Sequence, residues 1–149
     1  MVVVAIVAIL ASIAIPSYQQ LIVSSRMGTQ ANEFLTMMQF TRSEAVKRNG
    51  RVTMCKSADG AACIATGDWA QGWIVFDVAS GTVLRVHAAL TGGSTLASSV
   101  NAFSYGANGQ TQAATFDLCS NNPVKYAGRD IALNATGRPT VAKDEATCQ

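Results

Sequence analysis

The chain has 149 residues, 13% of them charged, and a formal net charge of +2. This length suits one domain with a single core, and so mild a positive charge does not by itself indicate nucleic-acid binding. The charges are unevenly distributed, because residues 1–25 contain no Asp, Glu, Lys or Arg and the first charged residue is Arg26. The sequence therefore predicts an apolar N-terminal segment joined to one small domain.

The N-terminal run from Met1 to Ile15 is apolar except for Ser12. It is shorter than the roughly 20 apolar residues of a membrane-spanning helix. The run is either the apolar core of a secretory signal, with residues 12–14 as the cleavage site, or a spanning helix whose first residues lie upstream of this sequence. We favour the second interpretation, because no basic residues precede the run and the helical pattern continues beyond it.

The helical pattern extends to Asn49-Gly50, a favourable C-cap pair. We expect one helix of about 48 residues, with a first half over 1–27 that spans a membrane or enters a filament core, and an amphipathic half over 28–50 that packs on the domain. Pro16 and Gly28 are the points where we expect it to bend. The apolar residues that recur at threes, fours and sevens are Leu21, Ile22, Met27, Ala31, Phe34, Leu35, Met38 and Ala45.

After Gly50 the pattern changes to the period of two that is typical of β-strands. Residues 51–56 alternate like a half-buried strand, and residues 57–68 form a loop. Short strands with Gly, Asn and Ser turns predict an antiparallel sandwich over residues 51–149, packed on the helix, in an α+β fold. The other expected strands cover residues 72–78, 82–90, 95–100, 101–105, 111–119, 130–135 and 139–142. The aromatic residues expected in its core are Trp69, Trp73, Phe76, Phe103, Tyr105 and Phe116.

The four cysteines are Cys55, Cys63, Cys119 and Cys148. Their spacing does not match a zinc site, and His87 is the single histidine. A membrane-directed N-terminus favours two disulfides in an oxidising compartment. Four cysteines allow three pairings, of which we favour Cys55–Cys63 and Cys119–Cys148 because each joins neighbours in the sequence.

The segment VVVAIVAILASIAIPSYQQL, from Val2 to Leu21, closely resembles the N-terminal helix of type IV pilins and type II secretion pseudopilins. In that family a prepilin peptidase cleaves a leader, and the new N-terminus is methylated. Alignment on Pro16 implies that about six residues, including a glutamate, precede Met1, and these would complete a spanning segment. The segments that resemble the GspH/FimT/FimU branch are MQFTRSEAVKRNGRVTMCKS at residues 38–57, GDWAQGWIVFDV at 67–78 and DIALNATGRP at 130–139.

The resemblance implies a structural minor pilin that takes part in assembling a type IV pilus, in a priming or tip complex. The alternative is a minor pseudopilin of a type II secretion system. Implied partners are other minor and major pilins, met through the N-terminal helix, the prepilin peptidase and the bacterial inner membrane. The domain is expected in the periplasm and, within a pilus, outside the cell. No nucleophile motif accompanies His87, so we expect no enzyme, no catalytic residue, no metal and no cofactor.

DNA uptake is a third candidate function, because some FimT-type minor pilins bind DNA through a basic C-terminal motif of the form G-R-x-R-K. Gly137-Arg138 matches its start, whereas residues 140–141 lack its second arginine and its lysine. Phosphate binding depends on several cations acting together. The alternative is a solvated loop held by Cys119–Cys148. The possible DNA contacts are Arg138, Lys143, Lys125 and Arg129.

Overall fold

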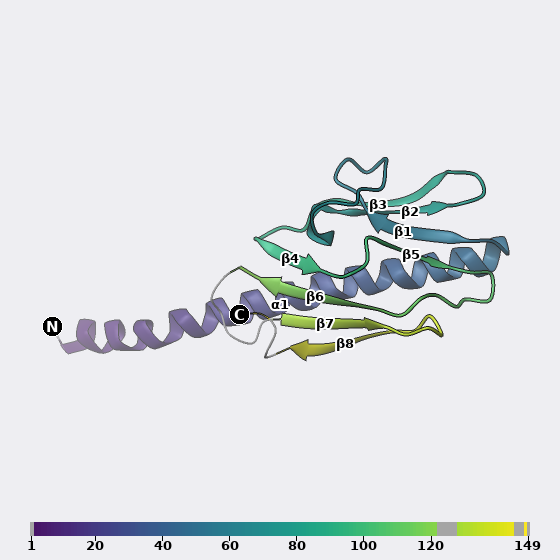
Figure 1. Ribbon diagram of the computed structural model, residues 1–149. Helices are drawn as coiled ribbons and strands as arrows, with labels where there is room; N and C mark the ends of the chain where they lie inside the picture. The colour runs from purple at the N-terminus through teal and green to yellow at the C-terminus, as the bar shows by residue number, and fades with distance from the viewer. Residues whose placement is uncertain (1, 122–127, 145–147, 149) are drawn as a thin grey trace.

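In a computed structural model, one long helix carries two antiparallel sheets (Figure 1). The structure describes residues 2–121, 128–144 and 148, with the backbone alone for residues 2–17 and 144. The α+β fold class expected from the sequence is confirmed. The elements are α1 (Val2–Arg48), β1 (Val52–Lys56), the 3₁₀ helix η1 (Trp69–Gln71), β2 (Trp73–Asp77), β3 (Val83–His87), β4 (Ser94–Ala97), β5 (Ala102–Tyr105), β6 (Ala114–Ser120), β7 (Gly128–Leu133) and β8 (Pro139–Asp144).

Helix α1 continues without a break through Pro16 and Gly28, and its N-terminal part projects beyond the sheets (Figure 1). The bends expected at these two residues stay predictions. The helix ends where Asn49 adopts a left-handed φ of 50° and the Gly50 amide donates to the Ala45 carbonyl at 3.1 Å. The side chains of the expected membrane segment before residue 18 lie outside the described part. Where side chains are described, no helical window is long and apolar enough to cross a membrane.

The eight described strands form two four-stranded sheets. Sheet A has the order β3-β2-β1-β5, and sheet B has the order β4-β6-β7-β8. Every pairing is antiparallel, as expected for a sandwich. Several predicted strands are longer than the observed ones; the strand expected over 95–100, for example, ends at Ala97. Its continuation leaves the ladder because the Ser98 hydroxyl bonds to the Thr115 carbonyl and accepts from the Val100 amide.

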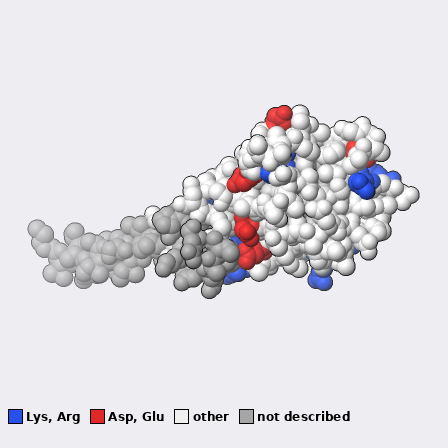
Figure 2. All heavy atoms as spheres, in the orientation of Figure 1, with Lys and Arg blue, Asp and Glu red and all other residues white. Residues whose placement is uncertain are grey.

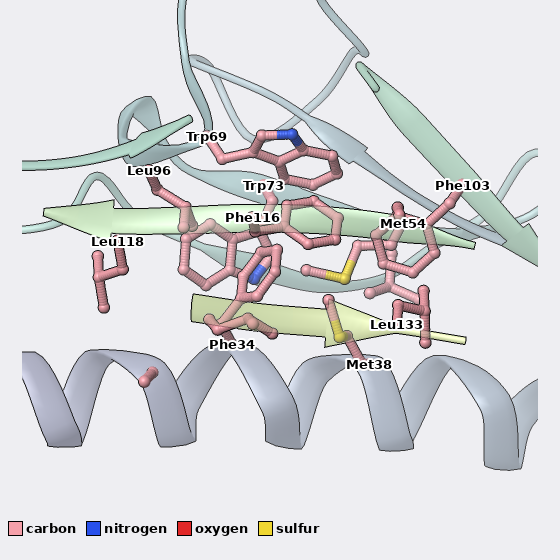
Figure 3. Close-up of a cluster of buried hydrophobic side chains, with 14 of the residues drawn as sticks. Phe34, Met38, Met54, Trp69, Trp73, Leu96, Phe103, Phe116, Leu118 and Leu133 are labelled. Carbon is pink, nitrogen blue, oxygen red and sulfur yellow. The ribbon is translucent and has the colours of Figure 1, made fainter. Parts of the chain in front are cut away.

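The core lies between α1 and the two sheets, and Phe34 stands at its centre (Figure 3). Its ring makes edge contacts with Trp69, Trp73 and Phe116, with centroids 5.5, 5.0 and 4.9 Å away. Because these partners come from η1, sheet A and sheet B, one helical side chain joins three parts of the domain. Of the aromatic residues expected in the core, Phe76 alone is absent from the cluster, since it lies on the opposite face of β2 from Trp73.

At its strand β1, sheet A is covered on both faces, which the sequence did not predict. All five residues of β1 are buried, so the expected half-buried strand is wrong. The loop after β1 covers the outer face: a Cβ added to Gly60 would lie 2.8 Å from Val86 on β3. Lys56 fixes the same loop by donating to the carbonyls of Ala65 and Gly67, at 3.3 and 2.7 Å. In sheet B, by contrast, β4 alternates buried and exposed residues.

Candidate subunit interface

Apolar side chains are exposed on α1 just before it enters the domain. Tyr18 and Leu21 are 67% and 68% exposed, and Ile22 is exposed as well. One residue later the pattern reverses, because Val23 and then Met27 are buried against the sheets. An apolar helical surface beside a folded domain is typical of a contact with another protein or a membrane. This stretch of α1 is therefore the first candidate for an interface.

The helix is fixed to sheet B where it leaves the domain. The Arg129 guanidinium on β7 donates to the carbonyl and the hydroxyl of Ser24, both at 3.2 Å. Six residues further along α1, the Gln30 side chain donates to the Thr91 carbonyl at 3.0 Å and accepts from the Ser94 hydroxyl at 2.7 Å. These bonds hold the projecting half of α1 in a set direction relative to the domain.

Sequence reasoning missed this anchor, because Arg129 was assigned to a possible DNA site. Its side chain is only 8% exposed and its guanidinium bonds to the helix, so it is not presented to a phosphate. The strand expected over residues 130–135 begins just after Arg129, so the sequence did not place this arginine on the sheet. Ser24 lies 105 residues away, and no local pattern identifies so distant a partner. Lys125 lies outside the described residues.

The two other possible DNA contacts are exposed but separated. Arg138 precedes β8, and Lys143 is near its other end. At about 3.3 Å per residue, five strand positions place them roughly 16 Å apart. Arg42 of α1 is the closer cation to Arg138, since its Nε lies 3.3 Å from where a Cβ on Gly137 would stand. On the face seen in Figure 2, basic atoms form separate groups and not one continuous surface.

The turn that presents Arg138 is held by hydrogen bonds. The Asn134 side chain accepts from the Arg138 amide at 2.9 Å, and the Tyr105 hydroxyl donates to the Gly137 carbonyl at 3.5 Å. Burial raises the pKa of Tyr105 to about 12. Arg138 is thus displayed on a defined turn.

Both disulfides join the pairs favoured from the sequence. Cys55 on β1 bonds to Cys63, and Cys119 on β6 bonds to Cys148. The first closes the loop over sheet A, and the second ties residue 148 to sheet B. Disulfides are typical of proteins that fold in oxidising compartments.

His87 packs as part of the fold. Its ring stacks on Trp73 with centroids 4.0 Å apart, and its Nε2 lies 3.4 Å from a Glu33 carboxylate oxygen. Among the described residues, no group of three His, Cys, Asp or Glu side chains is placed to hold a metal ion.

A long helix that projects from one end of a small disulfide-bonded domain, with two antiparallel sheets packed on its other half, defines a pilin-like subunit. Residues 30–137 match the protein family described as Type II transport protein GspH. This match covers more than half of the chain, and the chain belongs to the GspH family. Proteins of this class are membrane-anchored structural subunits of pili or pseudopili.

Three solved structures match the chain. One crystal form of the type IV minor pilin FimU of Pseudomonas aeruginosa is 26% identical, covers 79% of this chain and 89% of its own, and has a TM-score of 0.65. A second crystal form of FimU gives 27% identity, 77% and 91% coverage, and a TM-score of 0.61. The minor pseudopilin EpsH of the Vibrio cholerae Type 2 Secretion System shares the fold at 9% identity, covering 79% and 97%, with a TM-score of 0.57. No curated protein sequence matches significantly.

Proposed function

We propose that this chain is a minor pilin that takes part in assembling a type IV pilus, within a priming or tip complex. The single observation that carries the proposal is the exposed apolar surface of α1 around Tyr18 and Leu21, next to a rigid anchor on the domain. Packing such surfaces side by side removes them from water and holds subunits together without catalysis. The higher identity to FimU than to EpsH supports a pilus over a secretion system.

The alternative within the same class is a minor pseudopilin of type II secretion. Deleting the gene in its native host separates the two. A pilus role predicts fewer surface filaments and reduced twitching motility, with exoproteins secreted normally. A secretion role predicts exoproteins retained in the periplasm, and normal filaments and motility in the deletion strain would contradict the pilus proposal.

DNA binding is a separate prediction from the family resemblance, and it now rests on Arg138 and Lys143. The supporting observation is that both are exposed and that Arg42 lies against the same turn as Arg138. A gel-shift titration at low salt tests it with the full chain in detergent. Binding that is lost in Arg138→Ala combined with Lys143→Ala would support this site, and binding that survives both substitutions would remove it.

A further inference from the structure

Strand β3 (Val83–His87) forms one edge of sheet A. One side of β3 pairs with β2, and no described strand pairs with its other side. An edge strand presents a row of backbone amides and carbonyls that can pair with another extended chain. Charged residues on the strand and nearby bulges usually protect such an edge, and β3 carries only Arg85 and a bulge opposite Val75 and Phe76.

A groove of about 470 Å³ lies beside this edge, between β3 and α1. Its apolar floor is formed by Met37 and Phe40, and Thr36 lies next to them on α1. Met37 and Phe40 both pack against the core cluster, and both remain partly exposed to solvent. The inner face of sheet A rests on α1, so a strand added to β3 would continue the sheet over these same residues.

Two contacts fix the wall of the groove on β3. The Arg85 guanidinium carbon lies 4.8 Å from the centre of the Phe40 ring. The His87 ring is held between Trp73 and the Glu33 carboxylate. A wall that is already ordered loses little entropy when a ligand binds, which favours recognition.

Two charged side chains line the groove, Glu33 and Arg85. The Glu33 carboxylate already lies 3.4 Å from the His87 Nε2, so the charged group available to an occupant is Arg85. Its side chain is exposed, and no carboxylate in the described part of the chain lies within ion-pair distance of it. Its face is covered by Phe40, so its N–H donors are left for a group that approaches in the plane of the guanidinium. A carboxylate is the group that fits this fork of donors best.

The opposite edge of sheet A is a poorer candidate. At β5 (Ala102–Tyr105) the chain folds back on itself, since the Gly106 amide donates to the Gln110 carbonyl. The groove beside that edge is polar and includes Arg51 and Gln112. It therefore lacks the apolar floor that would hold a side chain from an added strand.

We propose that the open edge of β3 and the groove beneath it receive an extended segment of a neighbouring pilin subunit. This segment adds to sheet A as a fifth strand, places apolar side chains against Met37 and Phe40, and pairs a carboxylate with Arg85. Backbone hydrogen bonds supply the affinity, and the alternating side chains supply the specificity. The inference rests on the proposed function, because assembly is what brings a second subunit to this edge.

The contact belongs to the class of weak interfaces. One strand of five residues buries much less than the roughly 1,600 Å² of a standard protein interface. Such a contact suits subunits that are also held together by their helices, since the helices raise the local concentration of one domain around the next.

The test uses the full chain in detergent micelles and a fluorescent seven-residue peptide. The peptide alternates threonine with leucine, aspartate and leucine, so that the aspartate lies between the two leucines on one face. A matched peptide carries lysine in place of aspartate. Fluorescence anisotropy measures binding, and hydrogen exchange by mass spectrometry reports the amides of β3.

We expect the aspartate peptide to bind about tenfold more tightly than the lysine peptide, because one charge-assisted hydrogen bond is gained. Binding should slow exchange in residues 83–87. Arg85→Glu should reverse the preference between the peptides. Arg51→Glu, which changes an exposed arginine at the opposite edge of sheet A, should leave the preference unchanged.

Equal binding of both peptides, no binding of either, or binding without slower exchange in β3 would each overturn the inference. None of these results bears on the deletion phenotype, so the proposed function can fail or stand separately. A reversal of preference in Arg51→Glu would move the site to β5 and would also overturn the assignment to β3.

Discussion

Sheet A and sheet B have the same number of strands and the same antiparallel pairing, yet they are covered differently. In sheet A, β1 lies between α1 on one face and the loop of Cys55–Cys63 on the other, so it is buried throughout. In sheet B, β4 alternates buried and exposed residues, and Thr140, Val141 and Ala142 of β8 are all exposed. Whether a strand is fully buried therefore depends on whether another segment covers the outer face of its sheet, as much as on the strand's own sequence.

The largest expected effect comes from Phe34, which joins both sheets to α1. Phe34→Ala removes a fully buried ring with three aromatic neighbours, so the free energy of unfolding should fall by about 3–5 kcal/mol. Urea unfolding of the full chain in detergent, followed by tryptophan fluorescence, measures it. Phe76→Ala is the control, because this ring is only partly buried and lies outside the core cluster. An equal loss in both variants would contradict the core described above.

Removing each disulfide in turn compares the two sheets directly, because Cys55 belongs to sheet A and Cys119 to sheet B. The loops span 8 and 29 residues, and loop-closure entropy predicts losses of about 2.5 and about 3.6 kcal/mol when each is removed. Cys119→Ser with Cys148→Ser should therefore destabilise the chain more than Cys55→Ser with Cys63→Ser. Thermal unfolding of both double variants would decide this order. The reverse order would mean that covering sheet A contributes more than chain entropy.

How much of this fold the sequence predicted depends on how local each signal is. The length of α1 follows from the periodicity of its apolar residues, and its end follows from the Asn49-Gly50 pair. Both signals can be read from neighbouring residues in the sequence. Strand β2 was expected within one residue at each end for the same reason. The 3₁₀ helix at Trp69–Gln71 was not expected, although Asp68 caps it.

The interface features were harder to predict, because they depend on residues far apart in the chain. Arg129 bonds to Ser24, and Arg85 lies over Phe40, yet nothing near either arginine in the sequence indicates its partner. The favoured disulfide pairing, in contrast, needed only the order of the cysteines. The positive charge of an arginine therefore does not show whether it is a buried anchor, as Arg129 is, or an exposed contact, as Arg85 is.

A smaller effect is expected outside both sheets, at Gly28 on α1. A Cβ added there meets nothing within 4 Å, and alanine is the better helix former, so Gly28→Ala should stabilise the chain by about 0.5–1 kcal/mol. Circular dichroism during thermal unfolding measures the gain. If Gly28 is a required bend, the variant should also reduce assembly in cells; a stabilised variant that assembles normally would remove that role.

The smallest effect is expected at Asp77, at the end of β2 in sheet A. Hydrogen bonds from the Ser80 hydroxyl and then from the Ala79 amide lower the pKa of Asp77 below the ordinary value of an aspartate. The unfolded chain therefore binds this proton more readily, so the stabilisation is complete above about pH 4 and is lost as the pH falls through the lower, folded pKa. Asp77→Asn should flatten the acid limb of a plot of thermal midpoint against pH. An unchanged slope would contradict this assignment.

The central claim is that this chain works as a subunit of a pilus. The most direct measurement is quantitative mass spectrometry of filaments sheared from the surface of the native host and purified away from membranes. The account predicts that this chain is found in the filaments together with other pilins, at far lower abundance than the major subunit. Its absence from purified filaments, with the whole amount retained in the membrane fraction, would contradict the claim.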